Sequence, residues 1–200
     1  MRINSNSRLP ELIGPCHYYQ KWLEPAQATE LQIMLEHEIS WLSGWVKMFG
    51  KTHKIPRKQA WMSNNQAPYT YSHQRLDSQG WPNELEQLKQ WLQQDLKQQF
   101  NSCLLNRYQN GQEHMGWHAD DEPELGPKAH VAIISLGQDR DLLIKEKQSR
   151  KSYFSIRLEH GSLLYMPAPM QQHWLHALPK RSLRSHPGTR ISLTFRMRYT

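Results

Sequence analysis

The segment Arg190–Tyr199, RISLTFRMRY, decides the fold class because its apolar and polar residues alternate without a break. Its apolar positions are Ile191, Leu193, Phe195, Met197 and Tyr199, and the positions between them are Arg190, Ser192, Thr194, Arg196 and Arg198. Since successive side chains of a strand point to opposite sides, this pattern predicts a strand with one apolar face and one basic face.

Outward from this strand, the second half of the chain contains further short β-favouring runs separated by turn residues. These runs are Cys103–Tyr108, His130–Leu136, Asp141–Lys147, Tyr153–Leu158 and Ser162–Met166. The first half instead shows helical apolar spacing over Pro25–Ile39 and Trp81–Phe100, with a turn-rich stretch between them. We therefore expect a mainly β fold, a sandwich or jelly roll with flanking helices. Residues 1–100 would form an N-terminal extension on a core at 101–200, together one compact domain.

Composition limits the class of partner. Among 200 residues, 25 Lys and Arg against 18 Asp and Glu leave a net charge of +7, which favours an anionic partner such as nucleic acid. No apolar stretch approaches the length of a membrane span or of a signal peptide, so we expect an intracellular protein with no membrane partner. Two cysteines without a CxxC spacing argue against a disulfide framework or a thiolate zinc site.

The segment NRYQNGQEHMGWHADDE, residues 106–122, places His118 two residues before Asp120, so that both side chains of an extended chain face the same side. Further on, PAPMQQHWLHALP offers His173 and His176. Two histidines and one carboxylate form the facial triad of non-haem Fe(II) oxygenases, which leaves coordination positions open for a 2-oxo acid and O2. An HxD pair also arises by chance in a chain with eleven histidines.

The basic face of the terminal strand offers an anion site. Arg190 and Arg196 start about 20 Å apart along a straight strand, so they reach opposite ends of a short dicarboxylate only if the strand curves. An inward-facing arginine requires a partner, and a dicarboxylate supplies one in bidentate geometry. Asn106 and Tyr108 add neutral donors, and their two-residue spacing places both on one side of a strand. The alternative is a solvated basic face on an edge strand.

An ordered set of motifs between about Met48 and Arg198 resembles the AlkB family of Fe(II)/2-oxoglutarate-dependent nucleic-acid dealkylases, most closely the members that repair duplex DNA. The motifs are FGKTHKIPRKQA, PYTYS, NRYQNGQEHMGWHADDE, VAIISLG, HGSLLYMP, HWLHALP and RISLTFR. The resemblance implies a double-stranded β-helix, or jelly roll, whose N-terminal helical extension carries a nucleotide-recognition lid.

By position in these motifs, the resemblance implies an iron site at His118, Asp120 and His176. It also implies that 2-oxoglutarate is bound by Asn106, Tyr108, Arg190, Ser192 and Arg196, the last of which counts among the catalytic residues. The family often has Asn where this chain has Ser192, which keeps a polar contact with a shorter reach.

The implied reaction is oxidative demethylation of 1-methyladenine and 3-methylcytosine in DNA, with Fe(II) as the cofactor and 2-oxoglutarate and O2 as the cosubstrates. Formaldehyde, succinate and CO2 are released. A methylated base in a duplex must first be flipped out of the stack. The resemblance assigns stacking on that base to Tyr69 and Tyr71 and a hydrogen bond to Glu122. It assigns the wedge that fills the gap to Met48 and Phe49. Arg57 and Lys58 are expected to contact phosphates.

Two other functions remain open from the sequence. One keeps the oxygenase chemistry but applies it to methylated RNA or protein, and the other is a non-catalytic jelly-roll module that binds nucleic acid. The aromatic residues and Glu122 also have ordinary interpretations, as core packing and a solvated loop acid. We expect a monomer that acts in the cytoplasm at the bacterial nucleoid, or in the nucleus if the source is eukaryotic.

Overall fold

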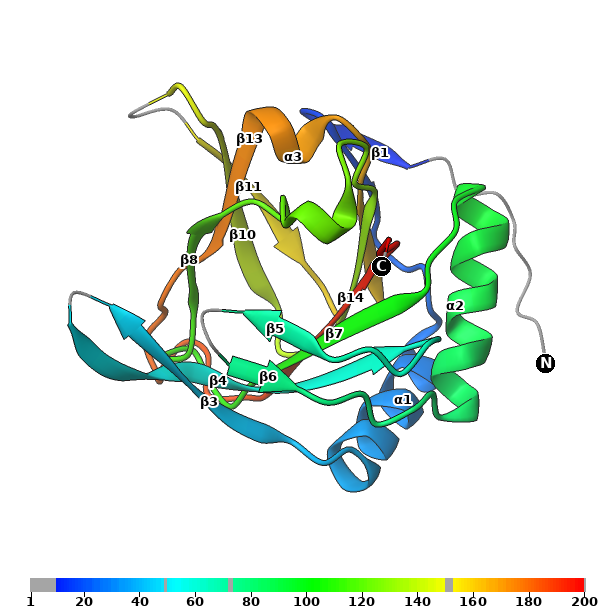
Figure 1. Cartoon of the computed structure of the whole chain (residues 1–200), viewed down its shortest axis with the longest axis horizontal. Coiled ribbons are helices and arrows are strands. Elements are labelled where there is room, and N and C mark those ends of the chain that lie inside the picture. The colour runs from blue at the N-terminus through cyan, green and yellow to red at the C-terminus, as the bar shows by residue number, and fades with distance from the viewer. Residues whose placement is uncertain (1–9, 49, 72–73, 150–152, 200) are drawn as a thin grey trace.

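The computed structural model describes residues 10–48, 50–71, 74–149 and 153–199. Its architecture is two facing β-sheets and a small two-stranded sheet, with the two long helices on one side (Figure 1). Along the larger sheet lie β1 (Glu11–Ile13), β2 (Cys16–Tyr19), β12 (Ser162–Met166), β9 (Val131–Gly137), β14 (Arg190–Arg196), β7 (Ser102–Tyr108), β4 (Lys51–Ser63) and β3 (Leu42–Met48). Along the smaller sheet lie β11 (Phe154–Leu158), β10 (Arg140–Glu146), β13 (Trp174–Leu178) and β8 (Met115–His118). The predicted mainly β fold with flanking helices is confirmed.

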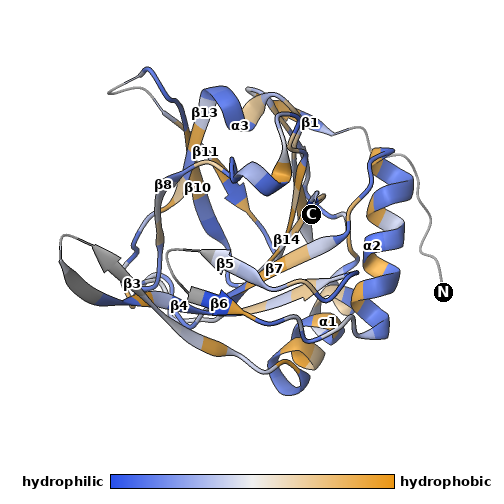
Figure 2. Cartoon of the chain, in the orientation of Figure 1, coloured by the Kyte–Doolittle hydropathy of each residue, from blue (hydrophilic) through white to orange (hydrophobic). Residues whose placement is uncertain are grey.

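Helices α1 (Pro25–Glu38) and α2 (Asn83–Leu96) cover the outer face of the larger sheet (Figure 1). The apolar stripe of α2, with Leu85, Leu88 and Leu92 buried, packs into the same cluster as Leu105 and Phe195 of the sheet. Figure 2 shows the polar residues of this helix on its other side. This packing supports the outer face of the larger sheet, so the opposite face of that sheet is available to form a site.

A second apolar cluster fills the space between the two sheets. Ile133 and Leu164 of the larger sheet pack there with Leu142, Ile144 and Ile156 of the smaller one. Every residue of β14 is buried, so its apolar face lies against the helices and its polar face lies between the sheets. Arg190 is 3% exposed and Arg196 is 1% exposed, which excludes a solvated basic face.

Strand register brings distant polar residues together. On the larger sheet, β14 pairs antiparallel with β7, so that Arg190 lies opposite Tyr108 and Ser192 lies opposite Asn106. On the smaller sheet, β13 pairs antiparallel with β8, which places His176 opposite His118. Directly opposed residues have Cβ atoms about 5 Å apart, so each pair shares one neighbourhood.

The first hundred residues contribute strands to the same large sheet as the second hundred. β1 to β4 all belong to the larger sheet, where β2 pairs with β12 and β4 pairs with β7. The boundary at residue 100 therefore does not separate two sheets. The turn-rich stretch between the helices contains the long strand β4 and the small hairpin of β5 (Tyr69–Tyr71) and β6 (Gln74–Leu76).

Two short helical turns complete the described fold. They are η1 (Pro123–Leu125), which follows β8, and α3 (Met170–His173), which immediately precedes β13. None of the helices in the described ranges is long and apolar enough to span a bilayer.

Candidate active site

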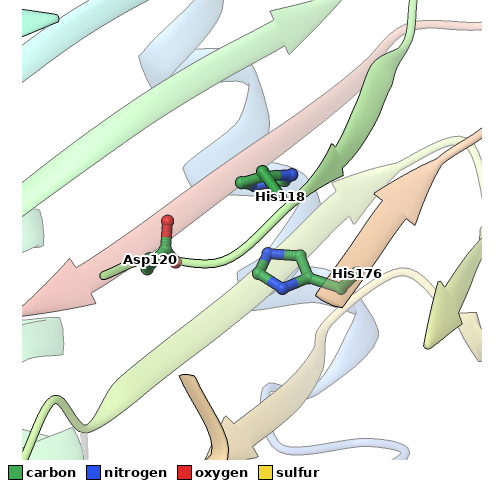
Figure 3. A group of neighbouring side chains, drawn as sticks. All are labelled: His118, Asp120 and His176. Carbon is green, nitrogen blue, oxygen red and sulfur yellow. The ribbon is translucent and has the colours of Figure 1, made fainter. Parts of the chain in front are cut away.

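Three side chains meet in the arrangement predicted for a metal site. His118 lies at the end of β8, Asp120 follows it in the loop, and His176 lies in β13. Their ligand atoms all lie within 4.8 Å of one another, and Figure 3 shows the three side chains gathered in one place. Asp120 and His176 are buried, and His118 is partly buried. The spacing suits one ion held by two imidazoles and one carboxylate.

The two imidazoles are prepared for a cation. Nδ1 of His118 lies 2.9 Å from the carbonyl oxygen of Gly116. Because a carbonyl can only accept, Nδ1 donates this hydrogen bond, and Nε2 is the nitrogen left to face an ion. Burial, His118 and Arg196 together hold the pKa of His176 well below its usual range, so this ring is neutral. Its Nδ1 is buried without a hydrogen-bond partner among the described residues.

Arg196 joins the metal site to the acidic loop beside it. Its Nη1 lies 3.4 Å from Oδ1 of Asp120 and 3.3 Å from Oε1 of Glu122. Burial opposes the positive charge, but Asp120, Tyr69 and Glu122 outweigh it and raise the pKa of Arg196 above its usual value. These contacts are long for charge-assisted hydrogen bonds, so the guanidinium retains capacity for a further acceptor.

Arg190 has no acidic partner among the residues that the structure describes. Its Nη2 donates to Oγ of Ser135 over 2.9 Å, its guanidinium lies 5.5 Å from the ring centre of Tyr108, and its Nε is buried without a partner within the described part of the chain. Burial, reinforced by Arg140, lowers the pKa of Arg190 to about 10 although Tyr108 opposes the shift. A buried guanidinium in this state is an anion site, because a carboxylate would restore the missing charge and hydrogen bonds.

Asn106 is held in one orientation by two donors from β4. Arg57 Nε and Gln59 Nε2 donate to its Oδ1 over 2.9 Å and 3.0 Å. The Nδ2 of Asn106 is therefore the group left to donate into the space between the sheets. Arg57 is 7% exposed, so the prediction that it contacts phosphates on a surface rim is wrong. Lys58, the next residue, is exposed on the opposite face of β4.

One cavity collects these groups. It lies between the sheets, and the apolar part of its lining includes Leu104 and Ile133 from the larger sheet with Leu142 and Leu178 from the smaller one. Its polar lining includes every residue that the sequence predicted for iron and 2-oxoglutarate, namely Asn106, Tyr108, His118, Asp120, His176, Arg190, Ser192 and Arg196. The candidate metal triad and the buried guanidinium of Arg190 therefore face one cavity.

Comparison with known proteins agrees with this geometry. The family model described as the 2OG-Fe(II) oxygenase superfamily matches residues 15–196. The chain belongs to this superfamily. It is 40% identical to the DNA oxidative demethylase ALKBH2 of Bos taurus and 39% identical to that of Homo sapiens, over 86% of this chain and over 64% and 69% of those chains. These relatives place the oxygenase in the AlkB family.

More distant comparisons agree on the fold. The chain is 33% identical to the DNA oxidative demethylase ALKBH2 of Arabidopsis thaliana, over 90% of this chain and 65% of that one. A solved structure, the structure of OsALKBH1, superposes with a TM-score of 0.62 at 17% identity, covering 94% of this chain and all of the other. The chain thus spans about two-thirds of the length of its curated demethylase relatives.

The residues present fit the two groups in the superfamily name. His118, Asp120 and His176 supply the nitrogen and oxygen donors of a facial Fe(II) triad. The unpartnered Nε of Arg190 and the remaining capacity of Arg196 suit the two carboxylates of 2-oxoglutarate. Ser192 lines the cavity between them, so a shorter residue than Asn is accommodated there.

The side of the site expected to hold the base contains Tyr69 and Glu122. The hydroxyl of Tyr69 donates to Oε1 of Glu122 over 2.8 Å, while Oε2 of Glu122 is buried without a partner in the described ranges. The ring of Tyr69 is buried and stacks on Trp61 with centroids 4.9 Å apart. Tyr69 thus orients Glu122, which is no solvated loop acid, and its stacking on a base stays a prediction.

The other predicted base contacts cannot be placed. Phe49 lies outside the described residues, as do the side chains of Met48 and Tyr71, whose backbones belong to β3 and β5.

Sequence reasoning missed several supporting residues. Three of them are buried. Gln59 donates to Asn106, and Ser135 accepts from Arg190. Gln171 accepts from the backbone N–H of Asp120. The alternation of Arg57 and Gln59 in β4 is the same signal as that of β14 and could have revealed an inward polar face. Gln171 lies in a four-residue helical turn without a periodic pattern, so no sequence signal marks it.

The unpaired Arg190 predicts how the cosubstrate changes stability. In anaerobic solution with Fe(II), 2-oxoglutarate at 100 times its dissociation constant should raise the free energy of unfolding of the oxygenase by about 2.7 kcal/mol. Arg190→Met should abolish this increase. Without cosubstrate the variant should be at least as stable as the parent, because it removes a buried charge that lacks an anion. Thermal or denaturant unfolding measures both effects.

The matched control is Arg157→Met, on the exposed face of β11, where Arg157 pairs with Asp139. It should keep the full stabilisation by 2-oxoglutarate. Equal stabilisation of the Arg190→Met variant would show that the carboxylate binds elsewhere.

Proposed function

We propose that this chain is an Fe(II)/2-oxoglutarate-dependent dioxygenase that demethylates alkylated bases in DNA. The single observation that supports it most strongly is the shared cavity, where the His118, Asp120 and His176 triad and the buried Arg190 face one space. The names of the curated relatives, which are DNA oxidative demethylases, support DNA as the substrate. The net charge of +7 supports a polyanionic partner.

The protein's contribution to the reaction is to hold and orient. Bound Fe(II) with 2-oxoglutarate and O2 supplies the oxidising chemistry, which converts the methyl group to formaldehyde and yields succinate and CO2. Arg190 neutralises one carboxylate of the cosubstrate, and Asn106 Nδ2, fixed by Arg57 and Gln59, donates a hydrogen bond. Apolar side chains such as Leu104, Ile133 and Leu142 line the rest of the same space.

Glu122 is the best-placed group to recognise the base. Its Oε1 is occupied by Tyr69 and Arg196, so its buried Oε2 is the acceptor available to an exocyclic amine of adenine or cytosine. Methylation at N1 of adenine or N3 of cytosine gives the base a positive charge. A carboxylate binds such a cationic base more strongly than a neutral acceptor does. We extend the proposal to 1-methyladenine and 3-methylcytosine on this basis.

The proposal includes where and how the protein acts. A DNA substrate requires action in the compartment that contains the DNA, the cytoplasm of a bacterium or the nucleus of a eukaryote. We propose a monomer, since every residue predicted for iron and 2-oxoglutarate comes from one chain.

The metal triad gives the primary test. His118→Ala, Asp120→Ala and His176→Ala should each abolish formation of formaldehyde and succinate, because each removes one ligand of the same ion. Mass spectrometry of methylated oligonucleotides, DNA and RNA side by side, measures the product and identifies the preferred nucleic acid. Full turnover in all three variants would overturn the proposed function.

His173 provides the matched control for this series. It ends α3 three residues before His176, and its side chain is exposed. His173→Ala should retain activity within about twofold, as expected for a surface substitution.

The proposed role of Glu122 predicts a charge-dependent loss. Glu122→Gln should reduce kcat/KM for a methylated oligonucleotide about 10-fold to 100-fold, because a charge-assisted hydrogen bond is worth about 1.5–3 kcal/mol. The KM for 2-oxoglutarate should change little. Asp121→Asn is the control, since Asp121 is an exposed neighbour that pairs with Lys147. Equal losses in both variants would contradict a direct contact to the base.

Preference for duplex DNA has its own test at Phe49, which the AlkB resemblance assigns to the wedge. Unstacking costs a few kcal/mol per step, so Phe49→Ala should lower turnover of methylated duplex about 10-fold or more and spare single strands. Leu42→Ala, at the start of β3 with 45% exposure, is the control apolar truncation. Unchanged duplex repair by the Phe49→Ala variant would indicate a single-strand enzyme.

A further inference from the structure

Gln171 is a buried polar residue that the mechanism above does not use. It lies in α3, is 3% exposed, and its Oε1 accepts a hydrogen bond from the backbone N–H of Asp120 over 2.9 Å. Since a backbone N–H can only donate, the amide oxygen must face Asp120. The amide nitrogen then faces Sδ of Met166 at 3.7 Å, a weak acceptor. The side chain is therefore oriented toward the loop that carries a metal ligand.

This hydrogen bond links the two segments that supply the metal triad. Asp120 lies beyond the end of β8, where strand pairing no longer holds the backbone. Gln171 lies in the turn that leads directly into β13, which carries His176. Within the described part of the chain, the carboxylate of Asp120 has a long contact of 3.4 Å to Arg196 as its ion pair. Its peptide, by contrast, is held at an ordinary hydrogen-bond length by Gln171.

Metal affinity depends on the position of a ligand as well as on its identity. The carboxylate of Asp120 is joined to its peptide by a short side chain, so a displaced peptide displaces the ligand oxygen. Removal of outer groups that orient metal ligands costs about 10-fold to 100-fold in affinity or activity in other metal sites.

We propose that Gln171 is a positioning residue for the metal site, which fixes the backbone of Asp120 so that its carboxylate meets the ion shared with His118 and His176. The identity of the ion as Fe(II) rests on the proposed function. The alternative is that Gln171 only satisfies a buried N–H group, in which case it contributes to stability and not to metal affinity.

The neighbouring Gln172 offers a matched control. Its Nε2 donates to the carbonyl oxygen of Pro127, so it ties α3 to the same loop at a point remote from the ligand. Gln172 is exposed, whereas Gln171 is buried. A general tethering role for α3 would affect both variants alike.

The test compares Gln171→Met with Gln172→Met in the full chain. Equilibrium dialysis of Fe(II) under anaerobic conditions measures affinity, Co(II) absorption reports ligand geometry, and the Tm of the metal-free protein reports stability. Gln171→Met should weaken Fe(II) about 10-fold or more and alter the Co(II) spectrum, while Gln172→Met changes affinity by less than about twofold. Gln171→Asn keeps a buried amide but shortens the side chain by one methylene, so its oxygen no longer reaches the N–H of Asp120. This variant should lower Fe(II) affinity by a similar factor, and it serves as the test if the Gln171→Met variant does not fold.

Each remaining outcome opposes the proposal. Unchanged Fe(II) affinity in the Gln171→Asn variant, with a lowered Tm in the absence of metal, would assign Gln171 a structural role only. Equal weakening in the Gln172→Met variant would assign the effect to the whole of α3. Because these readouts need neither DNA nor turnover, an enzyme that fails to demethylate DNA would overturn the proposed substrate and leave this result standing.

Discussion

The candidate site depends on the burial of two guanidinium groups, those of Arg190 and Arg196, on the inner face of β14. Charges taken out of water destabilise a fold unless partners compensate for them, and the two arginines are compensated in different ways. Arg196 contacts Asp120 and Glu122, whereas Arg190 contacts a hydroxyl and an aromatic ring and, in the described ranges, no carboxylate. Arg190 is therefore a buried cation without an acidic partner among the described residues, and it is the group that we propose to bind an anionic cosubstrate.

The same arrangement places the metal site at the other end of the cavity. Pairing of β13 with β8 sets His176 opposite His118, and the loop after β8 returns Asp120 toward β14, where Arg196 meets its carboxylate. Arg196 also contacts Glu122, which in turn accepts from Tyr69. A single buried cation thus connects the metal ligand, the cosubstrate space and the side proposed for the base. Substitution at Arg196 would disturb all three, so it cannot report on one of them alone.

Rigid support comes from behind and from beside the site. The helices bury the outer face of the larger sheet, and Arg57 and Gln59 fix Asn106 from the neighbouring strand. Gln171 holds the peptide of Asp120. These residues are neutral amides or a guanidinium in hydrogen bonds with defined donors and acceptors. Such support holds the atoms that face the cavity in position before any ligand arrives.

Local pattern in the sequence was sufficient for the two long helices, for β14 with its two distinct faces, and for the pairing of His118 with Asp120, because each depends on residues close together in the chain. The motifs shared with the AlkB family extended this to His176 and to the residues predicted to bind 2-oxoglutarate, which line the same cavity. Only the tertiary structure decided that the basic face of β14 is buried, that Arg57 supports Asn106 instead of contacting phosphates, and that Gln171 reaches Asp120. Burial, strand register and contacts between distant segments arise from the packing of the two sheets, which no local spacing encodes.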